Sequence, residues 1–435
     1  MREDKGVCNH LKLLIKNGTL VDPVGGIGGV MDLLVEDGRI VVIGNGLDEP
    51  DAQVLDAAGL TVSAGLIDIH VHLRDPGLTE KEDILTGSLA AAHGGVTSIA
   101  CMPNTKPVID TPEQVAYVQE RAAQNCGVNV WPIGALSVGQ QGREMADLRA
   151  LREAGVVAIS DDGNPVMDAN LMRDGLMRAN RYKLTILSHC EDDNLVRGRA
   201  VNEGRVSRQL GLPGRPAIAE DLMVMRDAML AEETRTPVHI CHVSTAGAVG
   251  IIRQYKRKGV QITCETCPQY FTLTHEEVLR QGSLAKVNPP LRATKDKEAI
   301  LNGLRDGTID CIVTDHAPHT AAEKARPLTE APSGMVGLET SLALALTGLY
   351  HTGLMSLSDI IQKMTINPAK ILRIPRGSLS LGAAADITIF DPDERWTVDP
   401  ERFASKGRNT PFGGMELRGK VKYTIVNGRI IYQDC

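Results

Sequence analysis

The sequence predicts a (β/α)8 barrel with a second, smaller domain built from both chain ends. Between residues 64 and 375, short β-branched apolar runs alternate with stretches of helical period that are rich in Ala, Leu, Glu and Arg. Eight such runs occur, which is the number of strands that the barrel requires. A doubly wound sheet is the competing fold, but no GxGxxG motif follows the first strand to support it.

The barrel strands and several of its helices can be placed along the chain. We expect the strands at residues 66–70, 96–101, 128–133, 156–160, 184–189, 238–242, 260–265 and 309–314. Helices are expected between them, for example at 111–124, 145–154, 219–233 and 245–258. The carboxyl ends of all eight strands would open on one face, where the active sites of such barrels lie.

The two chain ends share a pattern of short apolar runs separated by turn signals. Asn17-Gly18, Asp37-Gly38 and Asn427-Gly428 each lie between apolar runs, which is typical of β-hairpins. Neither end has enough strands to bury a sheet face alone. We therefore expect both ends to form one small β-sandwich, with residues 1–63 and 376–435 around a barrel of residues 64–375.

Composition excludes several classes of protein. A net charge of −7 without a long Lys/Arg tract argues against a nucleic-acid surface. The polar N-terminus lacks the apolar region of a signal peptide, and the most apolar stretch, near 338–349, is too short and mixed to span a membrane. Nine cysteines scattered along such a chain indicate reduced thiols. We expect a cytoplasmic enzyme that acts on a small molecule.

His70 and His72 stand at the end of the first barrel strand, directly after the apolar residues 64–69. Residues two apart in a strand point the same way, about 6–7 Å apart, so the two imidazoles can converge on one metal ion. Arg74 continues the alternation and offers a planar set of donors to a carboxylate or phosphate. An isolated HxH motif is weak support for a metal site, so the other strand ends decide.

Those strand ends carry more metal-ligand chemistry. His189 and His242 end two further strands, Asp161-Asp162 follows the fourth and Asp315 follows the eighth. Such a set exceeds what one catalytic zinc needs and suits two metal ions, bridged by Asp161 or Asp162. Asp315 would bind metal and also act as general base toward the attacking water.

Neighbouring groups are expected to serve other purposes. His239 shares its strand with His242 and is expected to be packed or partnered. Strand alternation should point Cys190 and Cys241 away from the metal ligands.

The motifs together resemble those of dihydroorotases in the amidohydrolase superfamily, and the resemblance runs nearly end to end. The matching segments are AGLIDIHVHLRDPG (64–77), GGVTSIACMPNT (94–105), SDDG (160–163), SHCED (188–192), HICHVST (239–245), KVNPPLR (286–292) and TDHAPH (314–319). The resemblance implies reversible hydrolysis of the cyclic amide of L-dihydroorotate to N-carbamoyl-L-aspartate in pyrimidine biosynthesis.

The resemblance also implies a metal site and its ligands. Two zinc ions per subunit would be held by His70, His72, Asp162, His189, His242 and Asp315. Asp162 is thereby favoured over Asp161 as the bridging ligand. Hydantoinases and another class of dihydroorotases use a carboxylated lysine as the bridge, but no lysine lies between residues 156 and 170 here.

The resemblance also implies which residues contact the substrate. Arg74 and Asn104 would hold the ring carboxylate, assisted by His319, and Asn288 would bind the ring amide. The loop 331–337 would offer main-chain groups through Ser333 and Gly334, and His72 would also face the substrate. The family often has an aromatic residue where Ser333 stands, so affinity could differ if that side chain packs on the ring.

Several alternatives remain open at this stage. The segment 267–270 is closer to those of hydantoinases and allantoinases, which keeps another cyclic amidase activity in view. A silent dihydroorotase-like subunit of aspartate transcarbamoylase is the third reading. For all of these interpretations we expect a homodimer. Association with aspartate transcarbamoylase stays open. His316 and His319 stay open as alternatives to Asp315 for proton transfer.

Overall fold

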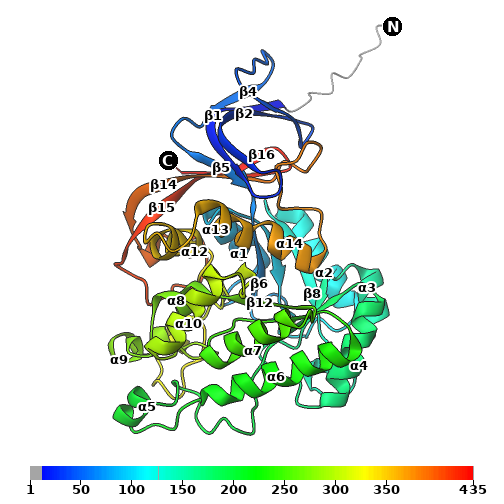
Figure 1. Cartoon of the computed structure of the whole chain (residues 1–435), viewed down its shortest axis with the longest axis vertical. Helices are drawn as coiled ribbons and strands as arrows, with labels where there is room; N and C mark the ends of the chain where they lie inside the picture. Colours follow the sequence, from blue (N-terminus) through cyan, green and yellow to red (C-terminus); the bar gives the residue numbers. More distant parts are fainter. Residues whose placement is uncertain (1–11, 126, 435) are drawn as a thin grey trace.

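The computed structural model describes residues 12–125 and 127–434, and its centre is a closed barrel of eight parallel strands (Figure 1). The strands follow one another around the barrel in chain order: β6 (Leu66–Val71), β7 (Val96–Cys101), β8 (Asn129–Gly134), β9 (Ala158–Ile159), β10 (Thr185–Ser188), β11 (Val238–Ile240), β12 (Ile262–Thr266) and β13 (Cys311–Ile312). A parallel bridge between Val71 and His316 closes the ring. All eight strands expected from the sequence are confirmed.

The helices lie outside the strands, as Figure 1 shows for α4, α6 and α7. Their bounds are α1 (Ile84–His93), α2 (Pro112–Asn125), α3 (Leu148–Ala154), α4 (Ala169–Arg181), α5 (Arg205–Leu210), α6 (Ala217–Thr234), α7 (Ala246–Arg257), α8 (Pro268–Thr272), α9 (Glu277–Gln281), α10 (Thr294–Arg305), α11 (Ala321–Lys324), α12 (Ser341–Ala345), α13 (Leu357–Met364) and α14 (Ile366–Leu372). Side-chain caps fix several starts: Asp83, Asp168 and Ser356 each accept a main-chain N–H in the first turn of α1, α4 and α13. The four helices expected from the sequence correspond to α2, α3, α6 and α7.

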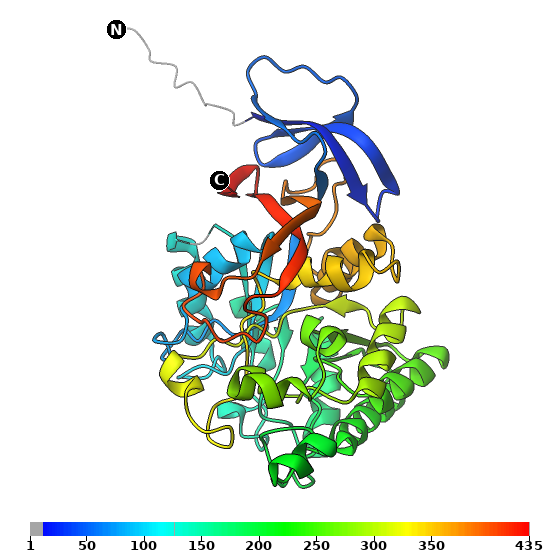
Figure 2. The same cartoon turned by 90° about the vertical axis from the view of Figure 1, so that its left-hand side faces the viewer.

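Both chain ends contribute to one further sheet, which stands at one end of the barrel (Figure 2). Its strands are β1 (Lys12–Asp22), β2 (Ile27–Glu36), β3 (Arg39–Gly44), β4 (Gln53–Asp56), β5 (Thr61–Ala64), β14 (Ile387–Thr397), β15 (Glu416–Val426) and β16 (Arg429–Gln433). The order is β16-β15-β14-β5-β1-β2-β3, and β4 pairs with the first half of β1. The antiparallel β5–β14 pair joins the two ends of the chain, in agreement with the prediction that both ends form one small domain.

This end sheet encloses a hydrophobic core of its own, separate from that of the barrel. Leu13, Leu33, Val62 and Ile387 are among its fully buried members. The chain passes directly from β5 to β6 through Gly65, where an added Cβ would lie 2.1 Å from Thr97 Oγ1. The chain therefore approaches β7 closely just before the strand that carries His70.

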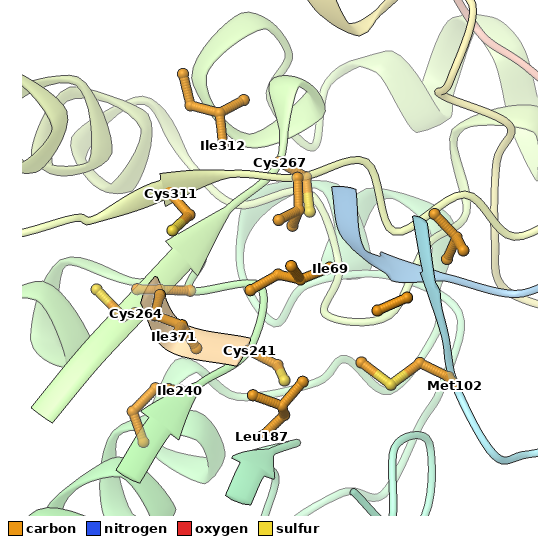
Figure 3. Close-up of a cluster of buried hydrophobic side chains, with 14 of the residues drawn as sticks. Ile69, Met102, Leu187, Ile240, Cys241, Cys264, Cys267, Cys311, Ile312 and Ile371 are labelled. Carbon is orange, nitrogen blue, oxygen red and sulfur yellow. The ribbon is translucent and has the colours of Figure 1, made fainter. Parts of the chain in front are cut away.

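The barrel core explains why the strand sequences are apolar throughout. Every residue of β6 and β7 is buried, because helices cover one face and the barrel interior the other. Figure 3 shows part of this core, in which Cys241, Cys264, Cys267 and Cys311 lie among aliphatic side chains. These thiols are free, as expected. Among the described residues, no helix has the length and apolar character to span a membrane.

Candidate active site

The six predicted metal ligands converge at the carboxyl ends of the strands. Each lies at a strand end or within three residues after it, and all are buried: His70, His72, Asp162, His189, His242 and Asp315. His189 and His242, which are far apart in the sequence, lie 2.8 Å apart between Nδ1 and Nε2. The barrel topology therefore brings together the residues that the sequence scatters.

Asp162 occupies the centre of this cluster. Its Oδ1 lies 3.3 to 3.4 Å from nitrogens of His70, His189 and His242. Its Oδ2 lies 3.5 Å from His72 Nε2. Two groups suited to a metal ion result, one with His70 and His72 and one with His189 and His242, and Asp162 is the member they share. A single carboxylate is thus placed between two imidazole pairs.

Asp161 lies in different surroundings. Its Oδ1 accepts hydrogen bonds from the main-chain N–H groups of Leu136, at 2.8 Å, and Ser137, at 3.1 Å. Its Oδ2 accepts a short hydrogen bond from the Ser137 hydroxyl. Both oxygens of this carboxylate are therefore engaged by the loop after β8. The geometry favours Asp162 as the ligand common to both groups.

Asp315 completes the cluster on the side of β6. Its Oδ1 lies 3.0 Å from His72 Nε2 and 3.5 Å from His70 Nε2. Asp315, His242 and Arg74 have φ values of 51°, 33° and 60°, a region that side chains other than glycine rarely adopt. Strain of this kind is tolerated where a fold must aim functional groups at one point.

The donor set fits metal ions. His70 Nε2 and Asp162 Oδ1 are fully buried without a hydrogen-bond partner, which leaves two ligand atoms desolvated and unsatisfied. Burial alone would lower the pKa of His70, but the Asp162 and Glu265 carboxylates hold it well above its usual range. Burial alone would raise the pKa of Asp162, yet His70 and its neighbours hold it well below normal. The buried carboxylates thus favour positive charge at this site, either a proton on His70 or a metal ion.

A pocket of about 200 Å³ opens onto this cluster. It is lined by His72, Arg74, Asn104, Asp162, Gly163, His189, His242, Asn288, Asp315, Ala317, His319, Ser333 and Gly334. All the substrate-binding residues expected from the sequence are in this lining. A pocket of this volume accommodates a single small ring. Five of the six cluster residues line it: His72, Asp162, His189, His242 and Asp315.

The two asparagines present their amide nitrogens to this pocket. Asn104 Oδ1 accepts a hydrogen bond from His72 Nδ1 at 2.9 Å, and Asn288 Oδ1 accepts one from Arg215. Their Nδ2 groups make only contacts of 3.4 to 3.5 Å. Each oxygen already accepts one hydrogen bond, so the amide nitrogens are the groups left most available to a ligand. The two asparagines therefore favour acceptor groups such as carbonyls and carboxylates.

Arg74 is the one formal cation in this lining. Its Nε donates to Pro318 O at 3.3 Å, and its Nη2 lies 3.5 Å from His319 Nε2. His319 is neutral at pH 7, because burial and the Arg74 charge lower its pKa to about 3. Its Nε2–H donates to Ser333 O at 2.9 Å. Arg74 thus remains as the charged partner for a substrate anion.

Comparison with known proteins places the chain in a family. A family model described as dihydro-orotase-like matches residues 59–248. The dihydroorotase of Pelotomaculum thermopropionicum is 52% identical over 98% of this chain and 99% of that protein. The dihydroorotase of Acetivibrio thermocellus is 50% identical over 97% and 99%, respectively. The chain belongs to the dihydroorotase family. It is an enzyme, and its fold class is that of metal-dependent cyclic amide hydrolases.

Solved structures agree with this fold. The L-hydantoinase of Arthrobacter aurescens superposes with a TM-score of 0.88 at 26% identity, covering 97% of this chain and 96% of that chain. The dihydropyrimidinase of Brevibacillus agri superposes with a TM-score of 0.86 at 24% identity, covering 97% and 95%. The barrel and the end sheet of this dihydroorotase-family chain are thus shared with other cyclic amidases.

Glu265 is a functional candidate that the sequence reasoning missed. It is the penultimate residue of β12 and is fully buried. Its Oε1 lies 2.5 Å from His70 Nδ1, and its Oε2 lies 3.0 Å from His239 Nε2. A carboxylate that accepts from the outer nitrogen of a ligand histidine fixes the ring and its tautomer. The available signal was a lone acidic residue inside an apolar strand. His239 is partnered, as expected.

Cys241 corrects one sequence expectation. Its thiol lies close to His70 and Glu265 rather than pointing away from the ligands. The alternation rule fails here because β11 ends at Ile240 and His242 adopts a left-handed backbone conformation. Figure 3 shows Cys241 within the buried cluster. Its pKa is raised by burial, so it remains a protonated thiol.

We expect Glu265→Gln to weaken metal binding by about 10- to 100-fold, because the amide cannot accept from both His70 and His239. Competition with a chromogenic zinc chelator measures this affinity. Glu220→Gln is the matched control, since Glu220 is equally buried but binds Ser244, Thr245 and Arg292. Equal metal affinity in Glu265→Gln and the wild type would contradict the role assigned to this carboxylate.

Proposed function

We propose that the chain catalyses the reversible hydrolysis of the cyclic amide of L-dihydroorotate to N-carbamoyl-L-aspartate, as a step of pyrimidine biosynthesis. The observation that carries the proposal is Arg74, a half-buried cation that lines a small pocket together with members of the His/Asp cluster. Dihydroorotate combines the two features that this pocket suits, a carboxylate on the ring and a cyclic amide. Hydantoin rings lack the carboxylate.

We further propose that two zinc ions occupy the cluster. His70, His72 and Asp162 would hold one, His189, His242 and Asp162 the other, and Asp315 would add a carboxylate beside His72. Imidazole and carboxylate donors suit zinc. When bound, zinc ions supply Lewis-acid polarisation of a carbonyl and lower the pKa of a water to about 7.

The chain's own residues would perform the remaining steps. Arg74 and the amide of Asn104 would hold the carboxylate, while the amide of Asn288 donates to a ring acceptor. Asp315 would accept the proton of the attacking water and pass it to the leaving ring nitrogen. His316 is less suited to that transfer, because Nε2 faces Glu82 at 3.3 Å and Nδ1 accepts from Gly337 N.

A direct assay tests this proposal. Purified enzyme supplied with zinc should turn over L-dihydroorotate, followed by absorbance, and metal analysis should find two zinc ions per chain. The likeness to an L-hydantoinase makes another cyclic amidase activity the second candidate, so hydantoin and allantoin belong in the same panel. Preference for hydantoin over dihydroorotate would overturn the substrate assignment. If metal analysis finds no zinc and the assay finds no turnover, the interpretation of the protein as a silent subunit is supported instead.

A further inference from the structure

Residues 327–335 form a loop that wraps around two buried ammonium groups. The groups belong to Lys286, which follows a short 3-10 helix (Gly282–Ala285), and to Lys324, the last residue of α11. Both residues are nearly inaccessible, with 4% and 5% exposure. Lysine is rarely buried to this degree unless it is partnered. The partners here define what the two residues do.

Each ammonium donates to three main-chain carbonyls. Lys286 Nζ donates to Leu328 O at 2.7 Å, Thr329 O at 3.4 Å and Ala331 O at 2.5 Å. Lys324 Nζ donates to Pro332 O at 3.1 Å, Gly334 O at 3.0 Å and Lys286 O at 3.4 Å. Three donors are all that an ammonium group has, so both side chains are saturated. Five carbonyls of the loop are held in this way.

Carbonyl dipoles rather than carboxylates compensate these charges. Within the described ranges, no carboxylate forms an ion pair with either ammonium; Glu323, the neighbour of Lys324, pairs with Lys81 at 2.8 Å. Burial and the proximity of Lys286 lower the pKa of Lys324 to about 7. Burying two lysine side chains side by side is costly, and their hydrogen bonds to the loop carbonyls hold the surrounding backbone in place.

The loop they shape forms one wall of the active-site pocket. Ser333 and Gly334 line it, and Ser333 O accepts from His319. Gly334 N donates to Lys286 O at 2.9 Å, which ties the pocket wall to the lysine main chain. Gly334 has a φ of 137°, and an added Cβ would lie 2.8 Å from Ala317 O. A small shift of the loop would therefore move atoms that line the pocket.

We propose that Lys286 and Lys324 are positioning residues that set the shape of loop 327–335 and, through it, the affinity of the pocket for its substrate. The inference deepens the proposed function and rests on it, because affinity is measured with L-dihydroorotate. Neither ammonium contacts the His/Asp cluster, so their loss should act on substrate binding and leave metal binding intact.

The test compares Lys324→Met, Lys324→Gln and a control. Met keeps the apolar stem and removes all donors, whereas Gln keeps two N–H groups. Lys363→Met is the matched control, because Lys363 is also buried but donates to Ile309 O, beside the start of β13 and away from the loop. Readouts are KM and kcat for L-dihydroorotate, zinc content, and hydrogen–deuterium exchange of the peptide covering 327–335 without substrate.

We expect Lys324→Met to raise KM about tenfold with little change in kcat or zinc content, since the hydrogen bonds to Pro332 O, Gly334 O and Lys286 O are lost. Exchange in 327–335 should accelerate, Lys324→Gln should lie between, and Lys363→Met should alter neither readout. Unchanged exchange in Lys324→Met, unchanged KM, or an equal response in Lys363→Met would overturn the proposal. A wild-type protein inactive on L-dihydroorotate would refute the proposed function alone, because exchange still decides the loop's dependence on Lys324.

Discussion

Asp162→Ala is expected to abolish activity and to remove at least one metal ion per chain. Asp162 is the carboxylate shared by both His-containing groups, so its loss disrupts each of them. The loss of several kcal/mol of transition-state stabilisation corresponds to a fall in kcat of about 10³-fold or more. Steady-state assay and metal analysis on the same preparation measure both effects.

Asp161→Ala is the adjacent control for this prediction. Asp161 anchors the main chain of Leu136 and Ser137 and belongs to neither of the two groups that share Asp162. Its removal should lower the free energy of unfolding by about 1–3 kcal/mol, the cost of leaving buried donors unpaired, while zinc stays bound. An active Asp162→Ala together with a metal-free Asp161→Ala would reverse the assignment of the bridging ligand.

The barrel and the cluster were predictable because they depend on chain order and strand ends. A parallel barrel brings every carboxyl end to one face, so His189 and His242 could be placed together without knowing a single distance. Turn signals and the small number of strands at each end predicted that the two chain ends form one small domain, whereas the place of Asn288 in the pocket was implied only by the family resemblance.

Partners that depend on side-chain direction could not be predicted in this way. Glu265 lies inside an apolar run, and nothing in the sequence says that its carboxylate crosses the barrel to His70. Arg215 reaches Asn288 from a loop whose path no periodicity predicts. Cys241 turns inward because the backbone leaves strand geometry after Ile240. These contacts are set by tertiary packing, which overrides local alternation.

The second large effect is expected for Arg74→Met. If Arg74 holds the substrate carboxylate, kcat/KM for L-dihydroorotate should fall about 10²–10³-fold, because a buried anion loses its charged partner. Met is unbranched at Cβ like Arg, so the strain at a φ of 60° is unchanged. Zinc content should stay at the wild-type value, since Arg74 is not part of either metal-binding group.

Dihydrouracil, the dihydroorotate ring without its carboxylate, tests whether Arg74 recognises the charge of the substrate or shapes the pocket. Dihydrouracil should inhibit the wild type and Arg74→Met with similar constants, whereas dihydroorotate should bind Arg74→Met more weakly than it binds the wild type. Arg74→Lys should recover part of the loss, because lysine restores the charge but not the planar pair of donors. An equal loss for both rings would mean that Arg74 shapes the pocket through Pro318, and the carboxylate assignment would then be wrong.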